Sequence, residues 1–358
     1  MEKHLQVRKL AIASNAEKKN SVRTFYAIGF DLLLLLVLAG CIVFALCAGK
    51  YPITAKESLE VLFGELTGRG GAYSEMTKNV VIGLRIPRIV ASILCGMMLA
   101  MSGVAYQSIF KNPLVSPDFL GVSNGACIGA AIAILMGLSG VYLSGFAFIG
   151  GIIAVVITVL IPTIMRSDSN IMLVLSGVIV GGAMSSILGF IKYVADPETE
   201  LAAITYWTMG SFTYVTMDEI KSVILTMVIP MVILFAMSWW LDILSMGESE
   251  AKSLGANIVV VRNVAIACAT LMTASSVCIS GTIGWIGLVI PHFARMCVGP
   301  NNTKLIPAAG LMGGIFLLLV DTITRTISIA EMPVSILTGL IGAPFYAILL
   351  YRQRKTLS

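Results

Sequence analysis

Long stretches of this chain carry no charged residue, and that feature limits its possible folds more than any other. The run from Ile89 to Phe110 contains no Asp, Glu, Lys or Arg, and neither does the run from Phe119 to Met165. A helix needs about 20 apolar residues to cross the hydrocarbon core of a bilayer. The second run is long enough for two crossings with a break near 137–145. We therefore predict an all-α integral membrane protein.

The composition agrees with this prediction. The chain is 57% hydrophobic and only 12% charged, whereas soluble domains carry about 25% charged residues. A soluble fold this apolar could not keep its surface compatible with water. The seven cysteines are scattered and form no CxxC pair, and the chain has only two histidines. The sequence therefore supports neither a disulfide framework nor a metal site.

The apolar runs predict about ten transmembrane helices. We place them at 27–48, 88–110, 119–137, 145–165, 171–191, 221–241, 260–280, 283–298, 304–327 and 334–351.

Basic residues set the expected orientation, because Lys and Arg are enriched in cytoplasmic loops. Six of the 24 basic residues lie in the first 23 positions, and three more follow residue 351. A basic N-terminus could also suggest nucleic-acid binding, but we favour a cytoplasmic anchor for the first span and predict no nucleic-acid partner. An even number of crossings places both termini in the cytoplasm. We therefore predict a cytoplasmic segment at 1–26, a transmembrane domain at 27–351 and a cytoplasmic tail at 352–358.

Three connections are longer than tight turns. The segments 49–87 and 192–220 fall on the outer side, and residues 201–209 have the apolar spacing of a short helix. On the inner side, the loop 242–262 contains "ESEAKSLGAN", which is typical of a short amphipathic helix that stops at Gly255. A short helix between two spans on the cytoplasmic face could fit a cleft in a partner protein.

Motifs for catalysis are absent from the sequence. It contains no GxxxxGK[ST] phosphate loop, no HExxH and no GxSxG, so we predict neither ATP hydrolysis by this chain nor another enzymatic activity.

One acidic residue, Asp321, lies deep in a predicted span, four residues before Arg325. An intramembrane acid is a candidate site for an ion-gradient-driven secondary transporter. The i, i+4 spacing also fits an ion pair on one helix face, and we favour that structural interpretation.

Glycines recur at helix-packing intervals, as GxxxGxxxG at Gly121, Gly125 and Gly129 and at every third residue at Gly281, Gly284 and Gly287. Small residues let helix backbones approach closely inside a membrane. We predict close helix packing at these positions.

Five segments together carry a family resemblance. They are "LRIPRIVASILCGMMLAMSGVAYQSIFKNPLVSPDFLGVSNGA" (84–126), "YWTMGSF" (206–212), "GESEAKSLGAN" (247–257), "GTIGWIGLVIPHFAR" (281–295) and "EMPVSILTGLIGAPFYAILL" (331–350). In this order they resemble the permease subunit of bacterial ABC importers for iron–siderophore complexes, haem and vitamin B12.

The resemblance implies a fold and a set of partners. It implies ten helices per subunit in the bacterial cytoplasmic (inner) membrane, with helices two to five and seven to ten as inverted repeats. It also implies a second permease subunit, in a homo- or heterodimer. Two cytoplasmic ATPase subunits would bind ATP and Mg, an extracytoplasmic substrate-binding protein would dock outside, and this chain would bind no cofactor itself.

The resemblance also assigns candidate site residues. Arg85, Arg88 and Arg325 match positions that dock the binding protein, and the arginine fork suits carboxylates. Residues alone offer the alternative that these arginines anchor helix ends at lipid headgroups, with Arg325 tied to Asp321. The segments "TYWTMGSF" and "EMPVS" are expected as short outer helices along the path. The matching residues of the ATPase coupling helix are Glu248, Ser249, Glu250, Ala251, Lys252, Ser253, Leu254 and Gly255, and those of the translocation path are Ser169, Asn170, Trp207, Met209, Ser211, Glu331 and Pro333.

The function implied by the resemblance is import of a ferric siderophore or related metal chelate, powered by the separate ATPase subunits. Haem or vitamin B12 are the alternative cargoes. An ion-gradient-driven secondary transporter remains the alternative from another class, with Asp321 as its one candidate site.

Overall fold

The computed structural model describes residues 26–68, 73–167, 169–255, 257–327 and 331–357, and every regular element in these ranges is a helix. The helices are the N-terminal helix (Tyr26–Cys47), α2 (Ala55–Thr67), α3 (Glu75–Lys78), η1 (Asn79–Arg85), α4 (Ile86–Ile109), η2 (Pro117–Leu120), α5 (Val122–Leu135), α6 (Val141–Ile164), α7 (Asn170–Val194), α8 (Glu200–Thr208), α9 (Met217–Ala236), α10 (Ser238–Met246), α11 (Glu248–Ser253), α12 (Ile258–Ser280), α13 (Ile286–Val298), α14 (Asn302–Ile327) and α15 (Val334–Leu357).

The predicted spans all have counterparts among these helices. Seven described helices are long and apolar enough to cross a membrane, and three shorter apolar helices, α5, α13 and the Val334–Ile348 part of α15, make ten. Their outer surfaces carry large apolar side chains, such as Leu36 on the N-terminal helix and Phe190 on α7. This apolar exterior fits lipid as the surrounding solvent, as the composition predicted.

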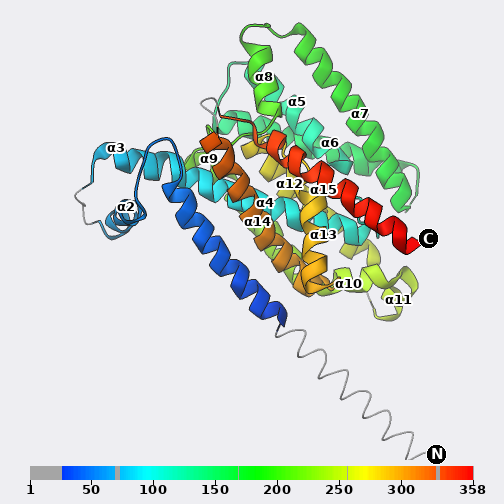
Figure 1. Ribbon diagram of the computed structural model, residues 1–358. Coiled ribbons are helices and arrows are strands. Elements are labelled where there is room, and N and C mark those ends of the chain that lie inside the picture. The colour runs from blue at the N-terminus through cyan, green and yellow to red at the C-terminus, as the bar shows by residue number, and fades with distance from the viewer. Residues whose placement is uncertain (1–25, 69–72, 168, 256, 328–330, 358) are drawn as a thin grey trace, which may run out of the picture.

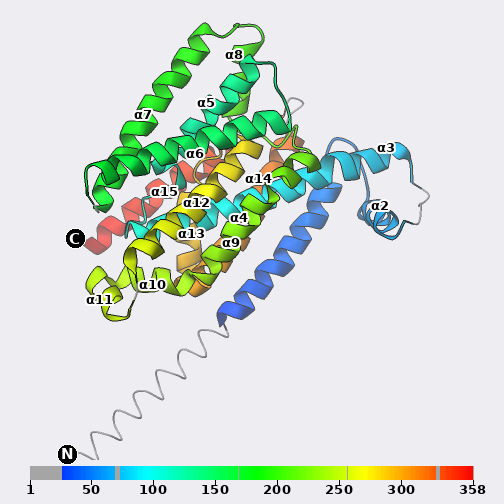
Figure 2. The same ribbon diagram turned by 180° about the vertical axis from the view of Figure 1, so that it is seen from behind.

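The short helices lie at the two ends of the bundle. In Figures 1 and 2, α2 and α3 lie beside the start of α4, whereas α10 and α11 lie at the opposite end. Following the predicted orientation, we call these the outer end and the inner end. The predicted cytoplasmic segment 1–26 falls almost wholly outside the described residues.

Helix α4 is the central helix of the bundle. It contacts α12, α13 and α14, and 78% of its most apolar stretch is buried, against 17% for the N-terminal helix. Helices α5, α6 and α7 pack against one another on one flank, and the N-terminal helix runs along another (Figure 2). Segments on α4 are therefore held from several directions.

Close helix contacts form at several of the predicted glycines, whereas Gly121 and Gly281 lie at helix ends with positive φ and a Cβ on Gly284 would meet nothing within 4 Å. A Cβ on Gly129 of α5 would lie 2.0 Å from the carbonyl oxygen of Phe146 on α6, and one on Gly125 would lie 2.4 Å from that of Gly150. Gly96 of α4 meets Gly313 of α14 in the same way. Gly121 has another task, since its φ of 80° joins η2 to α5.

The lengths of the helices repeat along the chain. Helices α4 to α7 span 24, 14, 24 and 25 residues, and α12 to α15 span 23, 13, 26 and 24. The second helix is the short one in both groups. This correspondence agrees with the inverted-repeat architecture of the fold.

The start of the second span differs from its predicted position. We placed it at 88, after Pro87, but the helix begins at Glu75 and continues through η1, a π-helical turn, into α4. Pro87 offers no N–H to the preceding turn, and a wider π turn accommodates that loss. Ahead of it, Thr54 and Glu57 form a capping box that starts α2 within the predicted outer segment.

Two further elements differ from prediction. Helix α10 occupies part of the predicted span 221–241 and of the inner loop 242–262. The stretch "EMPVS" forms no separate helix, because α15 begins at Val334 directly after Pro333. In contrast, α8 confirms the short helix predicted at 201–209, and α15 continues through Leu357 into the predicted tail.

Candidate functional site at the outer end

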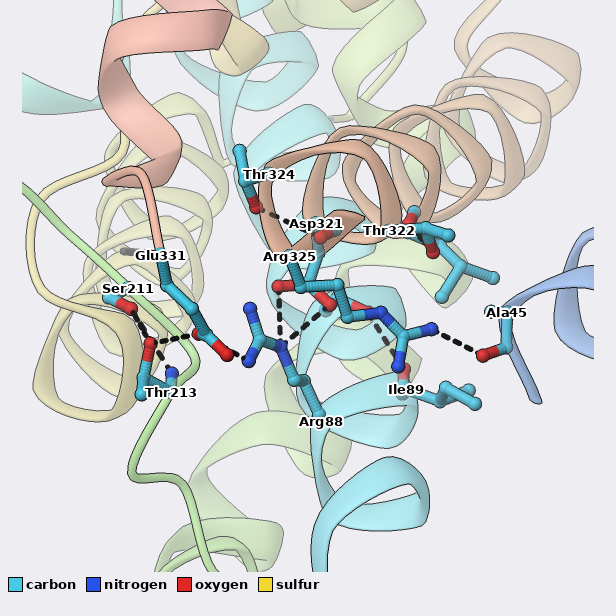
Figure 3. A network of polar contacts seen from close by, with 12 residues as sticks. Ala45, Arg88, Ile89, Ser211, Thr213, Asp321, Thr322, Thr324, Arg325 and Glu331 are labelled. Carbon is cyan, nitrogen blue, oxygen red and sulfur yellow. Dashed lines mark hydrogen bonds and ion pairs between the residues drawn. The ribbon is translucent and has the colours of Figure 1, made fainter. Parts of the chain in front are cut away.

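Charged side chains from distant parts of the sequence meet at the outer end of the bundle. We call Arg85, Arg88, Thr213, Asp321, Arg325 and Glu331 the outer polar cluster. Its members come from η1, α4, α14 and the connections that follow α8 and α14. Figure 3 shows most of this cluster from close by.

Arg88 lies between two carboxylates. Its Nε donates to both oxygens of Asp321, at 2.8 and 3.0 Å, and its Nη1 donates to Oε2 of Glu331 at 2.7 Å. Arg88 is 8% exposed and Asp321 is fully buried. Removing one partner of a buried pair leaves an uncompensated charge, which costs about 3–5 kcal/mol. The cluster therefore fixes α4 against α14.

The predicted ion pair between Asp321 and Arg325 is wrong. Asp321 pairs with Arg88 from the neighbouring helix instead, and Arg325 donates from Nη2 to the carbonyl oxygen of Ala45. The last carbonyls of a helix lack partners within it and carry partial negative charge. These carbonyls attract Arg325 away from the i−4 carboxylate. Because Asp321 is tied to an arginine, it is also a weaker candidate for a titrating ion site.

Arg85 reaches the same helix end. It donates from Nη1 to the carbonyl oxygen of Leu46 and from Nη2 to that of Tyr51, the latter at 2.5 Å. Together, Arg85 and Arg325 bind the carbonyls at the end of the N-terminal helix. A Cβ at Gly49 would lie 2.9 Å from Nη2 of Arg85, so glycine makes room for this contact.

All three arginines proposed for docking are thus buried and bonded within the chain, at 4%, 8% and 6% exposure for Arg85, Arg88 and Arg325. Docking of a binding protein stays a prediction. In this arrangement such a partner would meet the groups that cover the arginines before it met the guanidinium groups.

Glu331 is the most exposed charged member of the cluster, with 25% of its side chain accessible. Its Oε2 accepts from the Thr213 hydroxyl at 2.6 Å, and Thr213 is bonded in turn to Ser211 at 2.6 Å. Burial raises the pKa of the Glu331 carboxyl, but the Thr213 hydrogen bond and the charge of Arg88 outweigh burial, so its pKa is lowered overall. Glu331 therefore stays ionised near neutral pH.

Backbone contacts draw three connections together beside the cluster. The N–H of Ser211 donates to Ser280 at 2.8 Å, and that of Val334 donates to Gly210 at 2.9 Å. The Thr282 hydroxyl donates to the carbonyl oxygen of Thr208 at 2.6 Å. The connections after α8, α12 and α14 therefore form one junction.

Most of the predicted path residues lie at or near this junction. Met209 accepts from the Ser335 hydroxyl, and Pro333 precedes the bonded Val334. A cavity of ≈ 510 Å³ opens beside it, lined in part by Trp207, Ser211 and Tyr214. The structure thus brings together Trp207, Met209, Ser211, Glu331 and Pro333, although their role in a path stays a prediction.

Ser169 and Asn170 lie elsewhere, at the start of α7. Asn170 donates from Nδ2 to the carbonyl oxygen of Ile109 at 3.2 Å. Both residues line a separate cavity of ≈ 410 Å³ together with Arg166 and Arg262. They lie toward the inner end as defined above, and their role in a path stays a prediction.

The predicted coupling helix is present as α11, between α10 and α12. Gly255 has a φ of +78°, and its N–H donates to Lys252 at 3.0 Å, so the helix stops where the sequence predicted. Ala251 is buried and Leu254 is 56% exposed. The side chains of Glu248, Ser249 and Glu250 lie outside the described part of the chain.

Two polar contributors, Thr213 and Asp242, were not predicted from the sequence. Thr213 lies within "GSFTYVT", where nothing marks it as the partner of a glutamate. Asp242, placed in the inner loop, accepts from the N–H of Asn302 at 2.7 Å and caps α14. Burial raises the pKa of the Asp242 carboxyl, while hydrogen bonds from Asn302 act against this effect. The one signal available for Asp242 was that an acidic side chain is favourable near the N-terminus of a helix, here that of α14.

Comparison with known proteins identifies the group to which this architecture belongs. The model of the FecCD transport family matches residues 34–352. The chain belongs to the FecCD transport family. It is therefore a multi-pass permease of the inner membrane, the transport component of an ABC importer rather than an enzyme, and ATPase and permease partners are implied.

Individual relatives carry different cargo names. The molybdate import system permease protein MolB of Haemophilus influenzae is 37% identical and covers 91% of this chain and 96% of its own length. A probable iron chelatin transport system permease of Helicobacter pylori is 38% identical over 77% of this chain and 83% of its own.

A solved structure supports the fold. It is described as a metal-chelate type ABC transporter in an inward-facing conformation, with a TM-score of 0.80 and 35% identity. The match covers 90% of this chain and 98% of the solved one. The family and the importer permease architecture are therefore confirmed.

Proposed function

We propose that this FecCD-family permease moves a ferric siderophore or a related metal chelate into the cytoplasm. The observation that carries the proposal is the likeness, at a TM-score of 0.80, to a transporter described as of the metal-chelate type. The relative named for iron chelatin adds support. Haem and vitamin B12 are alternative cargoes, and the relative named for molybdate makes that oxyanion a further arm of the test.

The proposed division of labour follows from the two ends of the molecule. At the outer end, a substrate-binding protein docks near Arg85, Arg88 and Arg325, because guanidinium groups pair well with carboxylates. At the inner end, α11 seats in a cleft of the ATPase. ATP and Mg bind to the ATPase subunits, and this chain binds no cofactor.

Transport would then be a population shift between two arrangements of the permease. The ATPase subunits favour one arrangement when they hold ATP, and they act on this chain through α11. The path residues at the outer junction and those at the start of α7 lie at opposite ends of the bundle. This separation supports alternate opening toward the two sides.

The decisive experiment measures uptake in cells with and without this gene under iron starvation. Radiolabelled iron is presented as several ferric siderophores, with haem, vitamin B12 and molybdate in parallel. We expect uptake of one ferric chelate to be lost without the gene and restored by a plasmid copy. Loss confined to haem, vitamin B12 or molybdate would contradict the siderophore proposal while leaving the permease assignment intact.

A biochemical control addresses the division of labour. The purified permease without partners should show no ATP hydrolysis, and the assembled transporter should show it. A robust rate from the permease alone would overturn the assignment of ATP binding to separate subunits.

A further inference from the structure

We infer that Glu331 occupies, in the undocked permease, the position on Arg88 that a carboxylate of the docking protein takes. Docking would then release Glu331, together with the turn at residues 211–216 that is bonded to Glu331 through Thr213. The inference rests on the proposed docking near Arg88. The inference adds that Glu331 competes with the docking protein for Arg88, and that docking thereby affects the residues predicted to line the translocation path.

The two carboxylates on Arg88 are not equivalent. Asp321 is fully buried on α14 and receives two hydrogen bonds from Nε. Glu331 has 25% of its side chain accessible, lies between α14 and α15, and receives one bond from Nη1. Figure 3 shows the guanidinium group of Arg88 between the two side chains. Glu331 is therefore the partner that an approaching carboxylate can replace.

The charges of the cluster favour an additional anion. Three arginines face two carboxylates, which leaves one positive charge in excess, and Lys50 also acts on Glu331 electrostatically. Nε of Arg325 is buried and has no hydrogen-bond partner in the described part of the chain. Burying unmatched positive charge is unfavourable. This excess positive charge attracts a carboxylate from outside, and a Glu331 displaced from Arg88 would regain hydration.

Displacement of Glu331 would act directly on the junction. The carboxylate oxygen bound to Arg88 is the same Oε2 that accepts from Thr213, at 2.6 Å. Thr213 is bonded to Ser211, which lines the ≈ 510 Å³ cavity and donates its N–H to Ser280. Loss of Glu331 would therefore remove this attachment of the turn to Arg88. Docking at Arg88 would in this way act on the turn that borders the cavity.

Docking affinity tests the exchange directly. The assembled transporter is placed in lipid nanodiscs, and its affinity is measured for the soluble binding protein that supports uptake by this transporter. We compare Arg88→Gln, Glu331→Gln and the double variant. Glu198→Gln is the matched control, because Glu198 is an exposed acid on the same side with no ion-pair partner among the described residues.

Exchange predicts a specific pattern. Arg88→Gln should weaken docking, Glu331→Gln should tighten it about tenfold, and Glu198→Gln should leave it unchanged within about twofold. The gain from Glu331→Gln should disappear when Arg88 is already Gln. It should also persist at raised salt, since a contact exchange is screened less than long-range repulsion.

Each alternative result has a distinct meaning. If Arg88→Gln weakens docking but Glu331→Gln does not tighten it, the exchange is wrong and the docking proposal stands. If Arg88→Gln docks normally, docking at Arg88 is wrong and the exchange falls with it. If Glu331→Gln helps equally in both backgrounds, its charge acts at a distance and the exchange is again wrong.

Hydrogen exchange of the full-length chain provides a second test that does not depend on a stable Arg88 variant. Thr213→Val keeps the ion pair but removes the hydroxyl, and it should speed amide exchange in residues 211–216. Docking of the binding protein to the native transporter should speed exchange in the same residues. Unchanged or slower exchange on docking would overturn the release of the turn.

Discussion

The outer and inner ends of this permease are built in contrasting ways. At the outer end, Arg88 is bonded to acids 233 and 243 residues away in sequence, and the charged groups of the cluster other than Glu331 are buried. At the inner end, α11 is a helix of six residues whose neighbour Leu254 is largely exposed. The outer end completes many contacts within the chain, whereas the inner end presents a small helix to its surroundings.

This difference matches different tasks. Buried, mutually bonded charges hold one geometry and respond when a competing charge arrives. Among the described side chains at α11, Ala251 is buried whereas Lys252, Ser253 and Leu254 are exposed, and these give a partner a surface to bind. We therefore expect substitutions at the outer end to act first on stability, and substitutions at α11 to act on coupling while the chain stays folded.

The largest effect is expected for Asp321→Asn. This change leaves Arg88 buried with one carboxylate fewer, so the permease should lose about 3–5 kcal/mol of stability. Thermal unfolding in nanodiscs measures the loss. Asp218→Asn is the matched control, because Asp218 forms an exposed pair with Lys221, and such pairs contribute about 0–1 kcal/mol. Equal unfolding temperatures for the two variants would contradict the buried pair.

At the inner end, Leu254→Asp tests whether a substitution beside α11 reduces coupling without reducing stability. We expect about a tenfold loss of uptake or of ATP hydrolysis in the assembled transporter, which corresponds to roughly 1.4 kcal/mol of lost coupling. Because Leu254 is 56% exposed, the unfolding temperature should hardly change. A large drop in that temperature would show that α11 is part of the core and would remove the distinction between the two ends.

Gly255 gives a backbone version of the same test. Glycine tolerates the φ of +78° found at this position. Asn adopts such a φ more often than other non-glycine residues do, whereas Val is strained there. Gly255→Val should reduce co-purification of the ATPase, and Gly255→Asn should preserve most of it. Equal binding by both variants would mean that the end of α11 plays no part in the contact.

The sequence could predict the contacts with lipid better than the contacts between charges. The seven long apolar helices were predictable, because apolar length reports the hydrocarbon thickness directly, and the three shorter apolar helices also fall within predicted spans. The stop at Gly255 was also predictable, since a helix end has local chemistry. The pairing of Arg88 with Asp321 was not, because a local rule could only join Asp321 to Arg325 on its own helix.

Family resemblance supplied what local rules could not. It grouped Met209, Ser211, Glu331 and Pro333 as path residues, and the fold brings them to one junction. It gave no sign of Thr213, nor of the π turn η1 that precedes α4, because that turn depends on the surrounding packing. The roles in docking, coupling and translocation stay predictions, since they depend on proteins other than this chain.

A smaller effect at the outer end is expected for Gly49→Ala. A methyl group there would press on Arg85, which binds the end of the N-terminal helix, and the φ of +153° disfavours other residues. We expect a loss of about 1 kcal/mol or slightly more in thermal unfolding. Gly40→Ala is the control, because a Cβ there would meet nothing within 4 Å and alanine favours a helix. Equal losses of stability for both variants would argue against the role of Gly49 in making room for Arg85.

The smallest effect concerns the protonation of Glu331. Its pKa is lowered from the ordinary value of 4.5 by the Thr213 hydrogen bond and by Arg88, against the effect of burial. The stabilisation from this carboxylate is therefore complete above that ordinary value and is lost as pH falls through the lowered one. Between pH 7 and 5 the unfolding temperatures of the native chain and of Glu331→Gln should differ by a constant amount.

At lower pH the unfolding temperature of the native chain should approach that of the variant, because protonated glutamate and glutamine bind Arg88 equally poorly. Other acids titrate in both proteins, so the difference between them isolates Glu331. A difference that is already lost above pH 4.5 would mean that the pKa of Glu331 is not lowered and that Glu331 is not ion-paired in the undocked permease. The outer end would then resemble the inner end more than its geometry indicates.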